Sequence, residues 1–231
     1  MTSGRFRVTR AGERVTISFD DGGMNLLSRD ALEELRQCLA VLRGEAGSRV
    51  IAFRSLRPSL FAAGADMKEM STFSGQDAEA LACLGQEVFT AIETLPAMTV
   101  ALIDGDCFGG ALDLAMAFDL RLATARSRVS HPGARLGIVT GYGGTSRWRR
   151  LLAISNARAL LLGNEVIHAD AALSMGLIDR IVEDFESELT RLERLDPSSV
   201  ALVKELTNHA DRLSQQELAL LAERLGSLYR R

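Results

Sequence analysis

The sequence has few cysteines and no long apolar run. Its 231 residues include three cysteines, Cys38, Cys83 and Cys107, and none of them stands in a CxxC pair. Cysteines this scattered indicate neither a disulfide framework nor a zinc or redox pair, so we expect no metal site and a reducing, cytoplasmic location. No segment approaches the roughly 18 apolar residues that a membrane-spanning helix needs. The first basic residues precede no apolar stretch, so we expect neither a signal peptide nor a membrane partner.

An excess of positive charge is missing as well. The 27 Lys and Arg residues are outnumbered by 30 Asp and Glu residues, which gives a formal net charge of −3. General nucleic-acid binders are usually clearly basic, so we expect no nucleic-acid partner. A local exception is the cluster of Arg147, Arg149 and Arg150 around Trp148. It is open to interpretation as a nucleic-acid or phosphate patch, but we favour a solvated helix face or salt bridges between subunits.

Several motifs that carry well-known chemistry are also absent. The chain has no GxGxxG after a strand, no GxxxxGK[ST], no HExxH and no GxSxG. Its densest glycine segment, Gly141–Gly144, has the wrong spacing for a dinucleotide loop. Dinucleotide, P-loop, zinc-protease and serine-hydrolase functions are therefore not supported.

What the chain does have is apolar residues in regular patterns. They make up 47% of the sequence, which is ample for a core. Alternation over Arg5–Arg10 and Arg14–Phe19 predicts a β-hairpin, and leucines repeating after Ser28 predict a helix that Gly44 closes. The other expected elements are strands at Arg49–Arg54, Met98–Ile103, Leu120–Ala123 and Ser127–Ser130, a long helix ending near Leu95 and a helix over Ala111–Phe118.

These elements also indicate how the chain is organised. Strands and helices alternate through the first two thirds, which predicts βα units and an α/β fold. The last third is mostly helical, and we expect it to pack on this domain or on a neighbouring subunit. A final amphipathic pattern fits either core packing or a subunit contact, and we favour core packing. Its members are Leu213, Leu218, Leu221 and Leu225.

One candidate loop follows the third predicted strand. It is Phe61–Met70, where small residues around Gly64 allow a ligand to approach the backbone closely. Asp66 and Glu69 suit the first turn of a helix, because negative charge there meets the positive end of the helix dipole. An ordinary loop that caps a helix explains the same residues, so both interpretations stay open.

The second candidate loop is Ile103–Asp113, in which a strand runs into a turn and paired glycines open a helix. Free backbone N–H groups at such a helix start form an anion site. Asp113 follows Gly110 by three residues, so one helical turn brings its carboxylate near the same end. The simpler alternative is that Asp113 only complements the helix dipole.

Both loops are similar to those of the crotonase (enoyl-CoA hydratase/isomerase) family. The segment Phe61–Met70 resembles the family's first oxyanion loop, and Gly105–Asp119 resembles its second. Pro132–Thr145 resembles the segment beyond the active site, and Asn25 matches the asparagine before the first helix. The blocks stand in the family's order and spacing, and the resemblance extends to about Leu177.

The resemblance implies a particular architecture. We expect a crotonase-like spiral core of ββα repeats with the CoA-thioester site over residues 1–180. A helical C-terminal region over residues 181–231 follows, shortened relative to the family. Since helices of that region commonly make the trimer contact in the family, the resemblance also implies a homotrimer or homohexamer.

For the site, the resemblance implies an acyl-CoA substrate held by the first loop. The backbone N–H groups of Ala65 and Gly110 align with the oxyanion hole, whose donors are worth about 3–4 kcal/mol each in other systems. Lys68 either pairs with a CoA phosphate or is an ordinary solvated lysine. No separate cofactor is implied, since CoA arrives as part of the substrate. The wall for adenine and pantetheine is matched by Ala63, Ala65, Asp66, Met67 and Lys68.

Two positions depart from the family's hydratases, which use two glutamates to place water and to shuttle its proton. Here Asp113 stands at the first position and Gly133 at the second. Glycine transfers no proton, so the standard two-carboxylate hydration is not expected. Asp113 either acts alone as acid or base or is assisted by a substitute. The substitute candidates are His131, Asp106 and Tyr142.

The leading hypothesis is an enzyme of the enoyl-CoA hydratase/isomerase type. It would stabilise a thioester enolate for water addition, for elimination or for a double-bond shift. The alternative from another class is a CoA-thioester-binding protein with little turnover, which Gly133 suggests. Decarboxylation and thioester hydrolysis stay open among the enzymes, because these reactions share the enolate or oxyanion.

Overall fold

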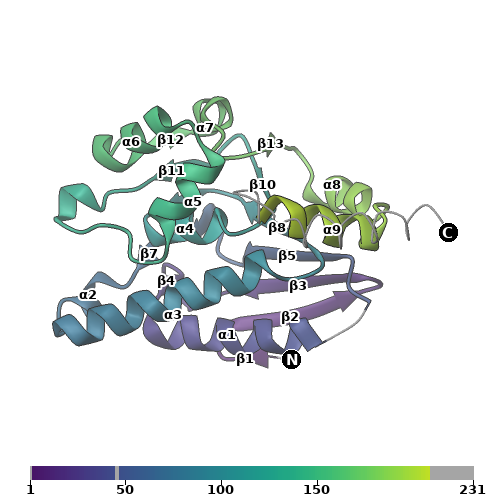
Figure 1. Ribbon diagram of the computed structural model, residues 1–231, viewed down its shortest axis with the longest axis horizontal. Helices are drawn as coiled ribbons and strands as arrows, with labels where there is room; N and C mark the ends of the chain where they lie inside the picture. The colour runs from purple at the N-terminus through teal and green to yellow at the C-terminus, as the bar shows by residue number, and fades with distance from the viewer. Residues whose placement is uncertain (1, 45–46, 209–231) are drawn as a thin grey trace, which may run out of the picture.

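The computed structural model describes residues 2–44 and 47–208 (Figure 1). The leucine pattern predicted over Leu213–Leu225 and the shortened C-terminal end lie outside the described residues. None of the described helices is both long enough and apolar enough to cross a bilayer.

The main sheet has seven strands, and its first part is the predicted hairpin. Strands β2 (Phe6–Ala11) and β3 (Arg14–Phe19) pair antiparallel, with Phe6 opposite Phe19. From β3 onward the neighbours are parallel, in the order β1-β2-β3-β5-β8-β10-β13. The remaining strands are β1 (Thr2–Ser3), β5 (Val50–Ser55), β8 (Met98–Ile103), β10 (Leu120–Ala123) and β13 (Arg180–Ile181). The parallel part confirms the predicted βα units.

Two smaller sheets carry the candidate loops. The first has the order β12-β11-β9-β6, and the second pairs β4 with β7 in parallel. Because β6 pairs with β9, the loop that follows one strand lies beside the loop that follows the other. The strands are β4 (Leu26–Leu27), β6 (Leu60–Ala62), β7 (Gly64–Ala65), β9 (Asp106–Phe108), β11 (Arg128–Ser130) and β12 (Ile167–His168).

The predicted first helix is α1 (Arg29–Gly44), and it packs against the long helix α3 (Gly75–Glu93) (Figure 1). The Ala31 backbone N–H donates to Ser28 Oγ at 3.2 Å and is thereby capped. The predicted leucines all lie on the buried face, where each contributes about 1.5–3 kcal/mol. The other helices are α2 (Met67–Met70), α4 (Gly110–Ala115), the 3-10 turn Ala134–Leu136, α5 (Gly144–Leu151), α6 (Ile154–Gly163), α7 (Ala169–Met175), α8 (Phe185–Leu192) and α9 (Pro197–Asn208).

The sheet is buried on both faces. Along β5, Ile51 and Phe53 belong to the large cluster that also holds α1 and α3, while Val50 and Ala52 face a second cluster. Leu189 and Leu192 of α8 belong to that second cluster. The C-terminal region therefore packs on the core domain, which was one of the two expected arrangements.

The last third of the chain is less purely helical than expected. Both β12 and β13 lie there, and β13 pairs in parallel with β10, so the main sheet runs through the boundary expected at residue 180. Strands of two residues carry no alternation, so a pattern of apolar residues does not reveal them.

Asn25 joins three strands and fixes the chain ahead of α1. It is fully buried and has a positive φ of 53°, a conformation that asparagine tolerates better than most residues. Its side-chain amide donates to Ser55 Oγ at 2.8 Å and to the carbonyl oxygens of Phe61 at 3.2 Å and Phe19 at 3.3 Å. The asparagine that the family resemblance singled out is thus a structural anchor for the first candidate loop.

Candidate active site

The two predicted loops and the glycine-rich segment meet at one cavity of about 420 Å³. The first loop contributes Ala63, Ala65 and Met67, and the second contributes Gly109, Gly110 and Asp113. His131, Pro132, Gly133 and Tyr142 line it from residues 131–143, the segment that leads from β11 through the glycines to α5, and Leu81 lines it from α3. Apolar side chains dominate this lining, so charges inside act with little screening by water.

The backbone of the first loop lies directly against the start of α4. Gly64 has a φ of +98°, and a Cβ on it would lie 2.6 Å from the Phe108 carbonyl oxygen and 3.0 Å from the Gly110 nitrogen. A Cβ on Gly110 would lie 3.5 Å from the Ala65 nitrogen. Gly110 opens α4, so its N–H has no partner within the helix. The structure therefore brings together the two backbone nitrogens predicted for an oxyanion hole.

Asp113 lies in the first turn of α4, the helix that Gly110 opens, and is buried, with 1% of its surface exposed. Its Oδ2 accepts a hydrogen bond from Thr140 Oγ1 at 2.6 Å and lies 3.2 Å from His131 Nε2. Its Oδ1 finds no hydrogen-bond partner in the described part of the chain. A Cβ on Gly144 would lie 2.0 Å from this Oδ1, so the carboxylate rests against the first residue of α5. Asp113 is therefore a buried carboxylate in which Oδ2 contacts Thr140 and His131 and Oδ1 has no partner among the described residues.

His131, the first substitute candidate, joins Asp113 in the cavity. Its ring stands edge-on to Trp148, with centroids 5.2 Å apart and planes at 88°. The histidine is 4% exposed, and its Nδ1 has no partner among the described residues. A Cβ on Gly133 would lie 3.3 Å from this Nδ1. Sequence reasoning missed Thr140, because no motif links a loop threonine to an aspartate 27 residues earlier.

Tyr142, the second substitute candidate, is a buried phenol. Its ring packs against Gly110 and Gly85, where added Cβ atoms would lie 2.8 Å and 2.1 Å from ring carbons. Burial raises the pKa of Tyr142 well above its usual value, and the negative charges of Asp113 and Glu69 add to this. The phenol therefore keeps its proton at neutral pH, which suits a hydrogen-bond donor and not a base.

Asp106, the third substitute candidate, is not brought to the cavity. Its carboxylate accepts two hydrogen bonds of 2.7 Å from the guanidinium of Arg128, across the β9–β11 pair. It does not line the cavity. On β9 it pairs with Arg128 and lies outside the cavity lining, so we no longer consider it as the substitute acid or base.

The residues predicted to bind CoA divide into two groups. Ala63, Ala65 and Met67 line the cavity, but Asp66 and Lys68 do not. Asp66 caps α2, since its Oδ1 accepts hydrogen bonds of 3.0 Å from the Lys68 and Glu69 backbone nitrogens. Lys68 is exposed at the surface of α2 beside the cavity. The helix-cap explanation of this loop is therefore correct, and it coexists with a cavity formed by the same loop.

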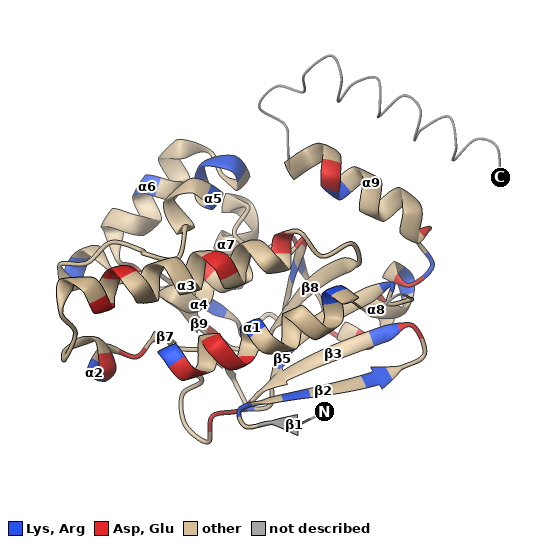
Figure 2. Cartoon of the chain, turned by 60° about the horizontal axis from the view of Figure 1, so that its bottom comes forward, with Lys and Arg blue, Asp and Glu red and all other residues tan. Residues whose placement is uncertain are grey.

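The arginine cluster is held by contacts within the chain. Arg147 is buried, which corrects the expectation of a solvated face at that position, whereas Arg149 and Arg150 are exposed. Arg147 donates to the Tyr142 carbonyl oxygen at 2.7 Å and to Glu93 Oε2 at 2.9 Å. Arg150 donates to Glu93 Oε1 at 2.6 Å. Figure 2 shows basic and acidic residues together on the same helices, for example on α1 and α9. Arg147 and Arg150 therefore tie α5 to α3 through Glu93.

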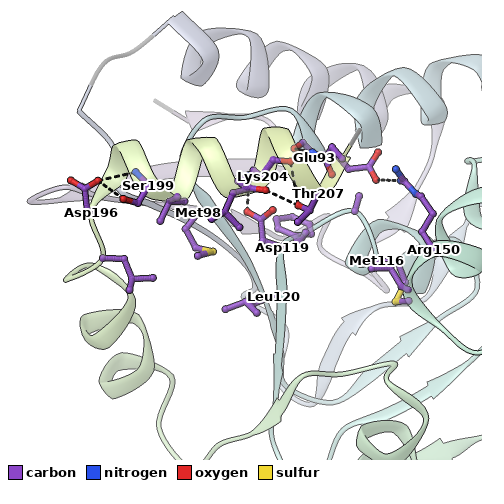
Figure 3. A pocket seen from close by; sticks show the side chains of 17 residues that line it. Glu93, Met98, Met116, Asp119, Leu120, Arg150, Asp196, Ser199, Lys204 and Thr207 are labelled. Atoms are coloured by element: carbon purple, nitrogen blue, oxygen red, sulfur yellow. Dashed lines mark hydrogen bonds and ion pairs between the residues drawn. The ribbon is translucent and has the colours of Figure 1, made fainter. Parts of the chain in front are cut away.

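A larger cavity of about 600 Å³ lies elsewhere, between α9 and the ends of β8 and α4 (Figure 3). Its cations already face carboxylates: Lys204 Nζ lies 2.6 Å from Asp119 Oδ2, and Arg150 contacts Glu93. Burial lowers the pKa of Lys204, against the raising effect of Asp119. The smaller cavity holds the adjacent backbone nitrogens of Ala65 and Gly110 and the unpartnered Oδ1 of Asp113, so we place the candidate active site there.

Known proteins match this chain over most of its length. The family model described as enoyl-CoA hydratase/isomerase matches residues 13–225. The crotonyl-CoA hydratase of Syntrophomonas wolfei is 33% identical over 163 residues, which span 71% of this chain but only 63% of that relative. The short-chain-enoyl-CoA hydratase of Clostridium acetobutylicum is 30% identical over 191 residues, which span 80% of this chain and 73% of that relative.

The fold has close counterparts among solved structures. The structure of Pseudomonas aeruginosa DspI matches with a TM-score of 0.89 and 26% identity, covering 98% of this chain and 96% of that one. The family match takes in both candidate loops and the glycine-rich segment that line the cavity.

Proposed function

The chain belongs to the enoyl-CoA hydratase/isomerase family, and from this we propose that it binds an acyl-CoA thioester and stabilises its enolate. One observation carries the proposal: the adjacent backbone nitrogens of Ala65 and Gly110 and the buried carboxylate of Asp113 belong to residues that line one largely apolar cavity. Donors and a proton acceptor placed on the same small volume are what enolate formation requires.

In this proposal the thioester oxygen accepts hydrogen bonds from the two N–H groups, which form the oxyanion hole. Negative charge grows on that oxygen as the enolate forms, so the donors bind the transition state more strongly than the substrate. Each is worth about 3–4 kcal/mol in comparable sites. Asp113 moves the proton as acid or base, either alone or with a neighbouring group as its partner, and such proton transfer contributes about 10²–10⁴ in rate.

Gly133 affects which reaction can follow formation of the enolate. It lines the cavity at the position of the second hydratase glutamate and supplies no proton-transferring group. Asp113 is also one methylene shorter than glutamate. The pairing of two carboxylates around one water is therefore absent, and single-proton chemistry is the better fit.

The family also supports a homotrimer or homohexamer in the cytoplasm, with Lys68 near the phosphates of CoA and no separate cofactor. Native mass spectrometry tests the assembly.

Replacing Lys68 with methionine should weaken binding of CoA thioesters several-fold while leaving kcat nearly unchanged, because a point charge on the phosphates is remote from the reacting carbons.

The experiment that tests the proposal incubates crotonyl-CoA with the protein in deuterated buffer and follows water addition and deuterium incorporation. We expect incorporation by the wild-type protein. Asp113→Asn should lower it by about 10²–10⁴, while calorimetric binding survives. Asp170→Asn, at an exposed aspartate on α7, is the control. Unchanged incorporation in Asp113→Asn would show that the assigned acid or base is wrong.

A second candidate, a non-catalytic CoA-thioester-binding protein, is favoured by Gly133 alone. Binding of several CoA thioesters without any incorporation or hydration in the wild-type protein would support it over the enzyme.

A further inference from the structure

We propose that Asp113 and His131 act as one proton-carrying pair, held in place by Thr140, and that this pair favours a double-bond shift over water addition. The inference rests on the proposed function and assigns its reaction. His131 is the catalytic partner of Asp113 here, and Thr140 is a positioning residue.

The contacts of the pair give each group a defined task. Thr140 Oγ1 and His131 Nε2 meet the same oxygen of Asp113, at 2.6 Å and 3.2 Å. A hydroxyl that donates to a carboxylate holds it in one orientation. With its proton on Nε2, directed at Asp113, the imidazole of His131 keeps a free electron pair on Nδ1. That atom is buried and has no partner among the described residues.

One helix holds both members of the pair. Gly144, the first residue of α5, lies against the Asp113 carboxylate, and the ring of Trp148 on the same helix contacts His131. Trp148 is fully buried, so its ring is an enclosed surface against which the imidazole packs edge-on. Such fixed orientation is what proton transfer between defined atoms needs.

The spacing of the pair leaves no place for a water between its members. A water that bridges two groups by hydrogen bonds of roughly 2.8 Å keeps them about 4–5 Å apart. Here Nε2 and Oδ2 lie 3.2 Å apart. A Cβ on Gly133 would lie 3.2 Å from His131 Cε1, so the imidazole occupies the space beside the missing second acid. His131 thus takes the place of the second acid, but it contacts Asp113 directly by a hydrogen bond and does not position a water between them.

The proposed step starts from a 3-enoyl thioester. His131 Nδ1 takes a proton from the α-carbon, and the electron pair of the broken C–H bond forms the enolate held by Ala65 and Gly110. Asp113 offsets the positive charge on the imidazolium. The proton then returns to the γ-carbon while the electrons of the dienolate shift, and the double bond moves from the β,γ to the α,β position. Atoms and electrons balance without a co-reactant.

The test follows 3-butenoyl-CoA and crotonyl-CoA in deuterated buffer, with isomerised and hydrated products measured separately. The wild-type protein should form crotonyl-CoA from 3-butenoyl-CoA faster than it adds water to crotonyl-CoA. His131→Gln, which keeps a side chain able to donate to Asp113, should lower kcat by about 10²–10⁴ with little change in KM. The double variant with Asp113→Asn should be no slower than the slower single variant, because groups that act as a unit are not additive.

The positioning role of Thr140 is tested by a separate pair of variants. Thr140→Val should lower kcat about tenfold or more at nearly constant KM, and Thr140→Ser should restore it, since serine supplies the same hydroxyl. A role in folding alone would not separate valine from serine in this way at equal fractions of folded protein. Fluorescence of Trp148, the only tryptophan, checks folding at the site in each variant. His131→Asn is the second variant should His131→Gln not fold.

The control is His168→Gln, at an exposed histidine on β12, which should keep the wild-type kcat. Wild-type kcat in both His131 variants, or multiplying effects of His131 and Asp113, would overturn the pair but leave the proposed function standing. Hydration that outruns isomerisation would overturn the preferred reaction. Absence of both reactions, despite measured binding of these thioesters, would overturn the proposed function and the pair with it.

Discussion

At the scale of single residues, the same chemical group has different tasks depending on its neighbours. Asp106 and Asp113 are seven positions apart, yet the first is neutralised by Arg128 outside the cavity and the second is buried beside the predicted oxyanion hole. Tyr142 borders the same cavity, but burial keeps its hydroxyl protonated. Surroundings, and not residue type, decide which titratable groups are available for proton transfer.

Tyr142 allows a prediction about stability and pH. Its pKa is raised in the folded state, so the neutral phenol is favoured there and the folded protein resists deprotonation. Its contribution to stability is therefore complete below the unfolded value of about 10 and is lost as the pH rises from there toward the higher folded value. Tyr142→Phe should remove this dependence. Its hydroxyl has no partner among the described residues, so the variant should match the wild type at pH 7.

Chemical denaturation at pH 7, 9 and 11 provides the measurement. The difference in unfolding free energy between wild type and Tyr142→Phe should be small at pH 7 and should shift in favour of the variant at pH 11. A difference that stays constant across the series would contradict the assignment.

At the scale of elements, α5 is the support on which the site is built. It begins where the glycine-rich segment ends, and Gly144 allows it to approach Asp113. Arg147 ties its middle to Glu93 of α3, and Trp148 fixes His131 from the same side. Gly144, the last glycine of this segment, therefore serves close packing against a carboxylate.

Gly144→Ala should reduce turnover sharply. The added Cβ would fall 2.0 Å from Asp113 Oδ1, so either the carboxylate or α5 must move. A shift of about 1 Å in a catalytic group can cost roughly 10²-fold in rate. Gly75→Ala is the matched control, because Gly75 is also the first residue of a helix and a Cβ there meets nothing within 4 Å. Equal kcat in the two variants would argue against this role of α5.

At the scale of the whole molecule, the C-terminal region belongs to the same packed body as the core. β13 adds to the main sheet beside β10, and α8 covers the face of the sheet opposite α1 and α3. Arg121 on β10 and Asp179 before β13 form an ion pair of 2.6 Å that is largely buried. We therefore expect the described residues to unfold together and not as two units.

Leu189→Ala tests this expectation. Leu189 is 1% exposed in the second cluster, and truncating a buried leucine costs about 2–5 kcal/mol. Unfolding followed by circular dichroism and by Trp148 fluorescence should shift to lower denaturant in one shared transition, although Trp148 is not in that cluster. Leu162→Ala, at a leucine 69% exposed, should change little. Separate transitions for the two signals would indicate that the regions fold independently.

Much of the fold was predictable because long periodic patterns are local. The hairpin, the leucines of α1 and strand β8 follow directly from alternation or helical spacing. The short strands β12 and β13 carry no such pattern. The two N–H positions were assigned by resemblance, but the contact that joins them depends on the pairing of β6 with β9. Thr140 could not be assigned, because its partner is set by a contact across 27 residues.

The sequence by itself determined the family and the α/β class, and its resemblance to the family predicted that Gly133 stands where hydratases carry a second glutamate. It also determined the cap at Asp66 and the helix start at Gly110, because these depend on neighbours within a few positions. Only the tertiary structure decided that His131 and Thr140 meet one carboxylate oxygen, that Asp106 faces away with Arg128, and that Arg147 is buried. Those outcomes depend on how segments that are distant in the sequence pack together, and a sequence pattern does not give the spatial distances between such segments.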